Sequence, residues 1–299
     1  MKRYLITAVK GIAMGAADVV PGVSGGTIAF MTGIYQELID SLKSIDYNSV
    51  KLLLKGDIKS FWNHINGNFL VAVFSGVLLS IFTLARLMQY LLVNHPIPLW
   101  SFFMGLIAAS AIFILRGIDK WRVSYFISLL VGVGVAAWIS LVSPSETTEA
   151  WWFIFLCGSI AICAMILPGI SGSFILLLMG KYAFMMEAIK EFNILVILVF
   201  LSGAVIGLIS FSHFLSWLLK RYYKQTITLL AGFMIGSLLK VWPWKILSER
   251  FEGIDYPALP SQFESITGAS PQLLFAVIFF LIGLSIVFAI EIASKAMHK

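Results

Sequence analysis

The chain has 299 residues, of which 60% are hydrophobic and only 12% charged, and its mean hydropathy is +0.95. A soluble domain carries about 25% charged residues, so this composition excludes an ordinary soluble protein and indicates a membrane protein. The formal net charge of +6 comes from Lys and Arg residues that stand between apolar stretches. This placement indicates control of membrane topology rather than nucleic-acid binding.

The first apolar segment is interrupted by the motif Pro21-Gly-Val-Ser-Gly-Gly-Thr27. Proline lacks a backbone N–H and glycine adopts turn conformations, so the motif predicts a break between two helical arms. Each arm has about 15 to 17 residues, or about 22–26 Å at about 1.5 Å per residue. That is short of the hydrocarbon core of about 30 Å. We therefore predict a re-entrant hairpin that is buried in protein or lines a cavity.

A polar insert at residues 43–68 follows the hairpin, and it combines four lysines with many apolar residues. This pattern predicts an amphipathic helix on the cytoplasmic surface of the membrane. Three apolar stretches come next, at residues 69–93, 99–115 and 123–142. Their lengths predict three transmembrane helices.

The second part of the chain repeats this plan. The motif Pro168-Gly-Ile-Ser-Gly-Ser173 aligns with the first motif at an offset of 147 residues, and the same register pairs Gly33 with Gly180 and Tyr35 with Tyr182. Further on, Ser75-Gly76 aligns with Ser202-Gly203 at an offset of 127 residues, because the second part lacks the insert. We predict an all-α polytopic protein with one membrane domain, made of repeats at residues 1–142 and 150–292.

Loop charges predict that the second repeat is inverted in the membrane. Lys and Arg residues are concentrated in the loops at 1–10, 43–68, 116–122, 220–225 and 293–299. The positive-inside rule places these loops, and both termini, in the cytoplasm. The two hairpin tips then enter from opposite sides and meet near the middle of the membrane. This is the plan of secondary transporters, whose substrate sites lie at broken helices.

Each tip is a candidate phosphate site. In both hairpins the second arm begins at the break, where unpaired backbone N–H groups and the positive end of the helix dipole favour an anion. The candidate phosphate-binding residues at the tips are Ser24, Gly25, Gly26, Ser171, Gly172 and Ser173. The alternative is that these small residues only permit close helix packing.

Two basic residues lie within apolar stretches at equivalent repeat positions, Arg86 and His213. Basic groups at membrane depth tend to face the interior of a helix bundle, so both are candidate phosphate-binding residues. One would lie toward the outer leaflet and the other toward the inner, and together they would pass a phosphate across the membrane. Alternatively, Arg86 extends to the interface and His213 is an ordinary hydrogen-bonded group.

Acidic residues in or near the hairpins are candidates for proton or ion coupling. Asp18 precedes the first tip, and Glu37 and Glu187 lie on the second arms. Burial raises the pKa of a carboxyl and makes a proton relay feasible at Asp18. A structural role for Asp18 as a helix cap is the alternative. Lys181 stands where the first repeat has Ile34, and we expect it to anchor at the surface.

No metal site or other cofactor is expected. Cys157 and Cys163 stand six residues apart in an apolar segment, and the four His residues are scattered along the chain. This spacing is typical of small core residues rather than of metal ligands.

The stretch from Gly11 to Thr27, together with Pro168–Ser173, resembles the bacterial PopT family of polyprenyl-phosphate transporters, and the likeness covers nearly the whole chain. The resemblance implies a flippase that moves undecaprenyl phosphate, the lipid carrier of cell-wall synthesis, from the outer to the inner leaflet of the cytoplasmic membrane. Its partners would be the polyprenyl-phosphate lipid and the bilayer, with no nucleic acid. The candidate site residues above rest on physical arguments and not on the resemblance.

Two other functions remain open from the residues. A secondary transporter of a soluble anion would use the same tips. A membrane-embedded polyprenyl-pyrophosphate phosphatase would use Ser24 or Ser171 as a nucleophile, but this chemistry needs a base and cationic groups beside the serine. Neither loop contains Arg, so we do not expect an enzyme. The sequence leaves open homo-oligomerisation and whether protons or sodium ions are coupled to transport.

Overall fold

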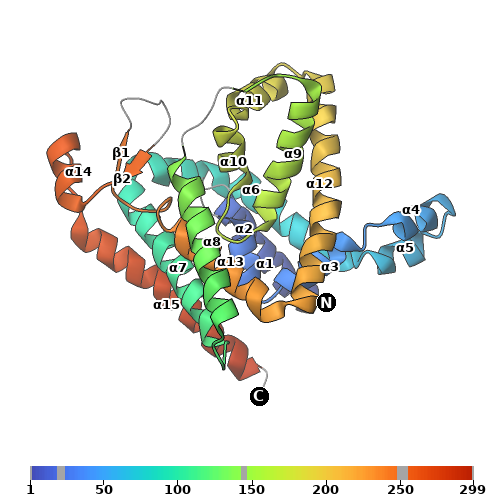
Figure 1. Ribbon diagram of the computed structural model, residues 1–299, viewed down its shortest axis with the longest axis horizontal. Coiled ribbons are helices and arrows are strands. Elements are labelled where there is room, and N and C mark those ends of the chain that lie inside the picture. The colour runs from blue at the N-terminus through green and yellow to red at the C-terminus, as the bar shows by residue number, and fades with distance from the viewer. Residues whose placement is uncertain (1, 19–23, 143–146, 248–254, 298–299) are drawn as a thin grey trace. The chain divides into compact units, whose positions relative to one another are not determined.

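The computed structural model describes residues 2–18, 24–142, 147–247 and 255–297 (Figure 1). Pro21 and Gly22 of the first predicted break lie outside these residues. The described residues are mostly helical, with one antiparallel ribbon in which Ile246 of β1 (Lys245–Leu247) lies opposite Tyr256 of β2 (Asp255–Pro257). The helices are α1 (Lys2–Asp18), α2 (Gly25–Met31), α3 (Tyr35–Lys43), α4 (Tyr47–Leu54), α5 (Ile58–His64), α6 (Gly67–Asn94), α7 (Pro96–Arg116), α8 (Val123–Leu141), α9 (Trp151–Ile166), α10 (Gly172–Leu178), α11 (Tyr182–Lys190), α12 (Ile194–Arg221), α13 (Tyr223–Ser237), α14 (Pro260–Thr267) and α15 (Leu273–Met297).

Four of the described helices are long and apolar enough to cross a membrane: α6, α7, α8 and α12. The pair α10 and α11 counts as a fifth span if it is taken as one element, although its two helices meet at 108°. The prediction of an all-α protein with several membrane-spanning helices is therefore confirmed. The three apolar stretches of the first half form α6, α7 and α8, as their lengths predict.

The chain divides into two compact units that do not coincide with the two predicted repeats. Unit 1 contains Met1–Ala85 and Pro144–Thr226, and unit 2 contains Arg86–Ser143 and Ile227–Lys299. Unit 1 therefore holds both hairpins together with α12 and most of α6, and unit 2 holds the other long helices of both halves. The boundaries 1–142 and 150–292 stay a prediction about the sequence repeat, because spatial compactness follows packing rather than chain order.

The second arm of each hairpin is two helices, not the single arm that the sequence predicts. In the first hairpin a seven-residue helix, α2, is followed by the nine-residue α3, and in the second α10 and α11 have the same lengths. The bends occur at Gly33 (φ 74°) and Gly180 (φ 64°). Glycine adopts this left-handed conformation without the steric cost that a Cβ brings.

Unit 1 is held together by helices that touch through glycine. Gly76 of α6 lies against the backbone carbonyl of Ala8 in α1, and Gly203 of α12 lies against that of Phe155 in α9. A Cβ at either glycine would collide with the carbonyl oxygen. Small residues at such crossings let backbones approach closely, which is how helices associate in lipid.

Unit 2 uses the same device in two helix pairs, of which α7 and α15 run side by side in Figure 1. Gly105 lies against the carbonyl of Phe280, and Gly283 against that of Phe102. The pair α8 and α13 makes the same reciprocal contacts through Gly132 and Gly232. Each pair therefore combines one helix from each half of the sequence.

The insert forms two short helices rather than the one amphipathic helix predicted. Asp46 caps α4 by accepting a hydrogen bond from the Ser49 N–H (2.9 Å), and Asp57 caps α5 through the Ser60 N–H (3.0 Å). These backbone bonds lower the pKa of both carboxyls. Gly56 (φ 75°) separates the two helices. Gly56 ends the first helix and Asp57 caps the next one, so the insert is divided here although its amphipathic pattern is continuous.

The glycine contacts predict opposite effects for two alanine substitutions. Gly203→Ala should destabilise the protein by about 1–3 kcal/mol, because the new Cβ is forced against a backbone carbonyl that has no room to move. Gly134→Ala in α8 meets open space, so it should be neutral or stabilise by up to about 1 kcal/mol. Thermal unfolding of both variants in detergent checks this, and equal melting temperatures would contradict it.

Candidate functional site

The two hairpin tips are joined by hydrogen bonds within unit 1. The Ser24 hydroxyl lies within donating distance of the carbonyl oxygens of Leu167 (3.2 Å) and Met165 (3.3 Å). In the other direction, the Gly169 N–H donates to Thr27 Oγ1 at 2.9 Å. Ser24 is 1% exposed and Thr27 is fully buried. The breaks of two hairpins that are far apart in the sequence therefore meet, and each provides partners for the other.

Close approach at the tips depends on glycine. A Cβ on Gly26 would lie 2.5 Å from the carbonyl oxygen of Ile166, at the end of α9. A Cβ on Gly172 would collide with the carbonyl of Ala161 in the same helix. The packing role that the sequence left as an alternative for these glycines is therefore present.

At the first tip, the backbone donors already have partners. The Gly25 N–H donates to Asp18 Oδ1 (2.6 Å), and the Gly26 N–H donates to the Ser24 hydroxyl (3.1 Å). Asp18 therefore occupies the position that an anion would take at the start of α2, where it accepts from the first N–H of the helix and supplements the N-cap residue Ser24 in this conformation. A phosphate can bind to the Gly25 N–H only if the carboxylate moves away.

The second tip differs, because Met165 stands at the position that corresponds to Asp18 in the repeat register. The Ser171 side chain does not cap α10 in the described part of the chain, and its hydroxyl lies 2.9 Å from that of Ser173. Gly172 and Ser173 line a small cavity of about 190 Å³ together with apolar residues of α9, α10 and α12. This tip carries no carboxylate that competes with an anion.

Two of the acidic candidates lie on the helices beyond the tips. Glu37 in α3 accepts from Arg3 (2.6 Å) and from the Asn66 amide (3.1 Å), whereas Glu187 in α11 is exposed. The neighbouring Asp40 accepts a hydrogen bond from Ser216 (2.7 Å) and so ties α3 to α12. The structure therefore does not bring Glu37 or Glu187 to the tips with Asp18.

Arg86 is exposed, which favours the alternative that its side chain extends to the interface. The side of α6 that packs in unit 1 carries the buried residues Phe69, Val73 and Ser80. Arg86 instead lies on the exposed side with Phe82 and Tyr90, four residues away in each direction. Residues four apart share a helix face, so Arg86 lies on the side of α6 that carries these exposed aromatic residues.

His213 belongs to unit 1 and is partly buried on α12. Its Nδ1 lies 2.8 Å from the carbonyl oxygen of Ile209. Because a carbonyl oxygen only accepts, Nδ1 carries the proton in this contact and Nε2 is the ring atom left for a ligand. The ring donates to a phosphate through Nε2 only when it is protonated.

Lys181 is a buried cation that sequence reasoning missed. We expected a surface anchor, but the side chain is only 4% exposed. Its Nζ donates to the Thr147 carbonyl (2.9 Å) and lies 5.4 Å from the centre of the Phe184 ring. The alignment of the two repeats could have indicated this burial, because Lys181 stands at the position of the apolar residue Ile34, and Ile34 is also buried.

The sequence pattern of a family described as undecaprenyl phosphate translocase-like matches residues 14–253. The chain belongs to this family. A protein of Vibrio cholerae named polyprenyl-phosphate transporter is 48% identical over 297 residues, which cover 97% of this chain and 96% of that protein. A Staphylococcus aureus protein of the same name is 34% identical over 257 residues, covering 80% and 86%. No solved structure matches the chain.

The matched region contains both hairpin tips and all six candidate residues there. This chain is thus a multi-pass membrane protein of a translocase-like family, as its sequence resemblance implied. Within the residues that the structure describes, no group of three or more His, Cys, Asp or Glu side chains is placed to hold a metal ion.

The hydrogen bonds between the tips predict the effect of Ser24→Ala. The substitution removes the cap of α2 and a buried donor to two carbonyls, so we expect a loss of about 1–3 kcal/mol of stability. Ser128→Ala is the matched control, because Ser128 is only partly buried and its hydroxyl donates to the Ser124 carbonyl of its own helix. Thermal unfolding in detergent measures both, and equal stability of the two variants would show that the contact between the tips contributes little.

Proposed function

We propose that this protein is a flippase that moves undecaprenyl phosphate from the outer to the inner leaflet of the bacterial cytoplasmic membrane, for reuse in cell-envelope synthesis. Both relatives are named polyprenyl-phosphate transporter, and each matches most of this chain. The observation that carries the mechanism is the contact between the two broken helices, in which buried Ser24 and Thr27 bond the second tip. Broken helices that meet are where secondary transporters bind their substrates.

The proposed architecture is an inverted repeat with cytoplasmic termini. The glycine contacts support it, because the pair Ala8 and Gly76 and the pair Phe155 and Gly203 differ by the offsets of 147 and 127 residues found in the sequence. Lys and Arg residues in alternate loops support the orientation. Two repeats of similar structure and opposite orientation provide a route to alternating access. If the two repeats exchange conformations, the site opens first to one side of the membrane and then to the other.

In this mechanism the phosphate binds at the two tips. Ser171, Gly172 and Ser173 provide donors without a nearby competing carboxylate, whereas Ser24, Gly25 and Gly26 are held by the protein's own acceptors. The phosphate reaches the first tip by replacing Asp18 at the Gly25 N–H. Arg86, being exposed, and His213, through Nε2, attract the phosphate on its way to and from the tips.

The same exchange makes Asp18 the centre of coupling. A carboxylate and a phosphate repel each other at close range, so phosphate binding favours the protonated or cation-bound form of Asp18. Protonation also weakens the bond from the Gly25 N–H and frees this donor for the phosphate. Glu37 and Glu187 are secondary coupling candidates at the outer parts of the hairpins, and sodium is the alternative coupling ion.

Two substitutions separate the coupling role of Asp18 from its capping role. Asp18→Asn keeps an oxygen that accepts from the Gly25 N–H but cannot exchange a proton, so we expect near-normal stability with transport that no longer responds to a proton gradient. Asp18→Ala should also lose about 1 kcal/mol of stability through the missing cap. Transport in proteoliposomes with and without an imposed gradient measures the difference. Gradient-dependent transport by Asp18→Asn would leave Asp18 as a cap only.

The proposed function is tested with purified protein in liposomes that contain undecaprenyl phosphate. We expect outer-leaflet phosphate to become inaccessible to an external probe, and Arg86→Ala and Gly25→Leu to slow this. A side chain at position 25 would collide with Asp18 and block the tip. Lys59→Ala, which removes an exposed cation of α5, is the control for Arg86→Ala.

The other outcomes of this assay point to the other functions. Release of free phosphate would indicate the phosphatase. Absence of lipid movement, with and without proton or sodium gradients, would favour a soluble anion as the substrate. Full activity of Arg86→Ala at normal abundance would remove Arg86 from the site.

A further inference from the structure

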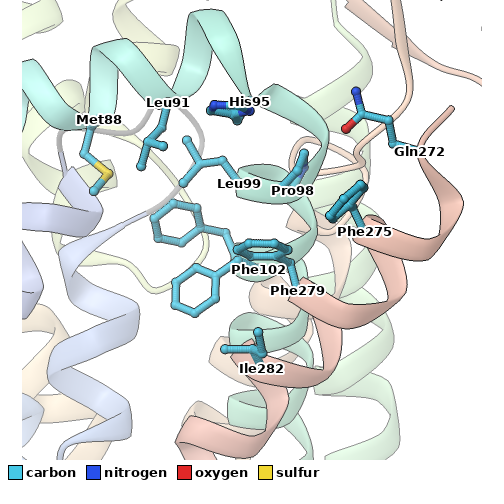
Figure 2. Close-up of a pocket in the computed structure, with 11 residues that line it drawn as sticks. Met88, Leu91, His95, Pro98, Leu99, Phe102, Gln272, Phe275, Phe279 and Ile282 are labelled. Atoms are coloured by element: carbon cyan, nitrogen blue, oxygen red, sulfur yellow. The ribbon is translucent and has the colours of Figure 1, made fainter. Parts of the chain in front are cut away.

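A large apolar cavity lies within unit 2, between the end of α6 and the helices α7 and α15 (Figure 2). Its volume is about 860 Å³. The polar residues of its wall are His95 and Gln272, and every other lining side chain is apolar. Figure 2 shows these two residues at one end of the cavity and Ile282 at the other, with phenylalanine rings between them.

We propose that this cavity binds the isoprenoid chain of the transported lipid at a stage when the phosphate is not at the hairpin tips, with the units nearest the phosphate in the cavity and the phosphate beside His95 and Gln272. The proposal rests on the proposed function and adds a site for the lipid chain, for which the hairpin tips of unit 1 provide none. It also names two polar residues that the sequence did not indicate.

The wall of the cavity fits a single, bulky hydrocarbon chain. Four rings line it, from Phe102 and Phe103 of α7 and Phe275 and Phe279 of α15. Burial of apolar surface away from water is favourable, so a hydrocarbon chain is a suitable occupant of a space with these walls. The volume lies within the range of about 300–1,000 Å³ found for ligand pockets, which suits part of a long chain and not all of it.

The cavity is also open toward the side where the rest of a chain would leave. Phe275 and Phe279 are 54% and 36% exposed, whereas Leu99 and Phe103 on the opposite wall are buried. On α15, Leu274 and Ile278 continue the exposed apolar surface. A chain whose first units lie in the cavity can therefore extend past α15 into the bilayer. This is the lateral opening that a lipid substrate requires.

The polar end fits a small anionic head. Both the imidazole of His95 and the amide of Gln272 can donate hydrogen bonds. His95 also immediately precedes α7, a helix of 21 residues, whose positive dipole end favours an anion. A phospholipid would bring two chains and a larger head to this one slot. A single chain with a monophosphate matches it better.

The spacing of α7 and α15 is fixed beside the cavity. Gly105 and Gly283 hold the two backbones in contact, and their carbonyl partners belong to Phe280 and Phe102. The ring of Phe102 therefore extends from a position that the backbone contact fixes, so its contribution to the cavity wall is a rigid one.

The test uses the full chain in nanodiscs and a polyprenyl phosphate that carries a diazirine in its first isoprene units. We expect light-induced labelling of cavity residues, located by peptide mass spectrometry. Leu99→Trp and Ile282→Trp should fill the cavity and reduce this labelling about tenfold, which corresponds to about 1.4 kcal/mol of binding free energy. Leu274→Trp is the matched control, because its exposed side chain precedes Phe275 but does not line the cavity.

Competition then identifies the occupant. Unlabelled polyprenol without a phosphate should compete for the cavity, and a saturated phosphatidic acid should not. The double substitution His95→Ala with Gln272→Ala should weaken labelling by the phosphate form and leave labelling by a diazirine polyprenol unchanged. Equal competition by the phosphatidic acid, or labelling spread evenly over the lipid-facing helices, would overturn the proposal.

The outcome is separate from that of the proposed function. Lipid movement in liposomes without cavity labelling would overturn the chain site and leave the transporter intact. Labelling that the cavity variants abolish, in a protein that moves no lipid, would support the chain site and contradict the flippase. Size-exclusion profiles of the tryptophan variants identify any that fail to fold, and Ile282→Trp, at a partly exposed position, provides the test if Leu99→Trp does not fold.

Discussion

A helix that breaks within a membrane must find partners for the backbone groups that the break releases, because hydrocarbon offers none. On the proposed topology both hairpins face that requirement, and each satisfies part of it with the other. The carbonyls of Met165 and Leu167 lie beside the Ser24 hydroxyl, and the Gly169 N–H donates to Thr27. The two breaks are thus stable together. This mutual dependence explains why both hairpins belong to unit 1, although they come from different halves of the sequence.

A side chain that bonds a backbone group at a break can also be replaced by a ligand. A backbone hydrogen bond inside a helix cannot be replaced without unwinding the helix, whereas the Asp18 carboxylate at the Gly25 N–H can rotate away. A ligand that offers an equivalent acceptor therefore competes at small structural cost. On the proposed mechanism, stability and binding use the same donors, so substitutions at the tips will affect both. Variants that keep the cap and change only the charge are consequently the informative ones.

The sequence predicted features that depend on local chemistry and on composition. Apolar stretches gave the membrane class, and the Pro-Gly motifs gave the hairpins. It missed features that depend on which way a helix turns in the folded protein. Arg86 is exposed although it lies in an apolar stretch, and Lys181 is buried although its charge indicated a surface position. The cavity beside Phe102 was equally invisible, since its walls come from distant parts of the chain.

The two hairpins differ most where their charges differ. In the repeat register Asp18 corresponds to Met165, and Lys181 corresponds to Ile34. One hairpin therefore carries a carboxylate at its tip, and the other carries a buried cation one helix beyond it. A duplicated scaffold with identical halves would hold an anion equally well from both sides. On the proposed topology, the cation lies toward the outside, where the phosphate arrives, and the carboxylate lies on the half that opens to the cytoplasm. Lys181 would then attract the phosphate when it arrives, and Asp18 would repel it before release. Both effects follow from the two positions at which the repeats differ in charge.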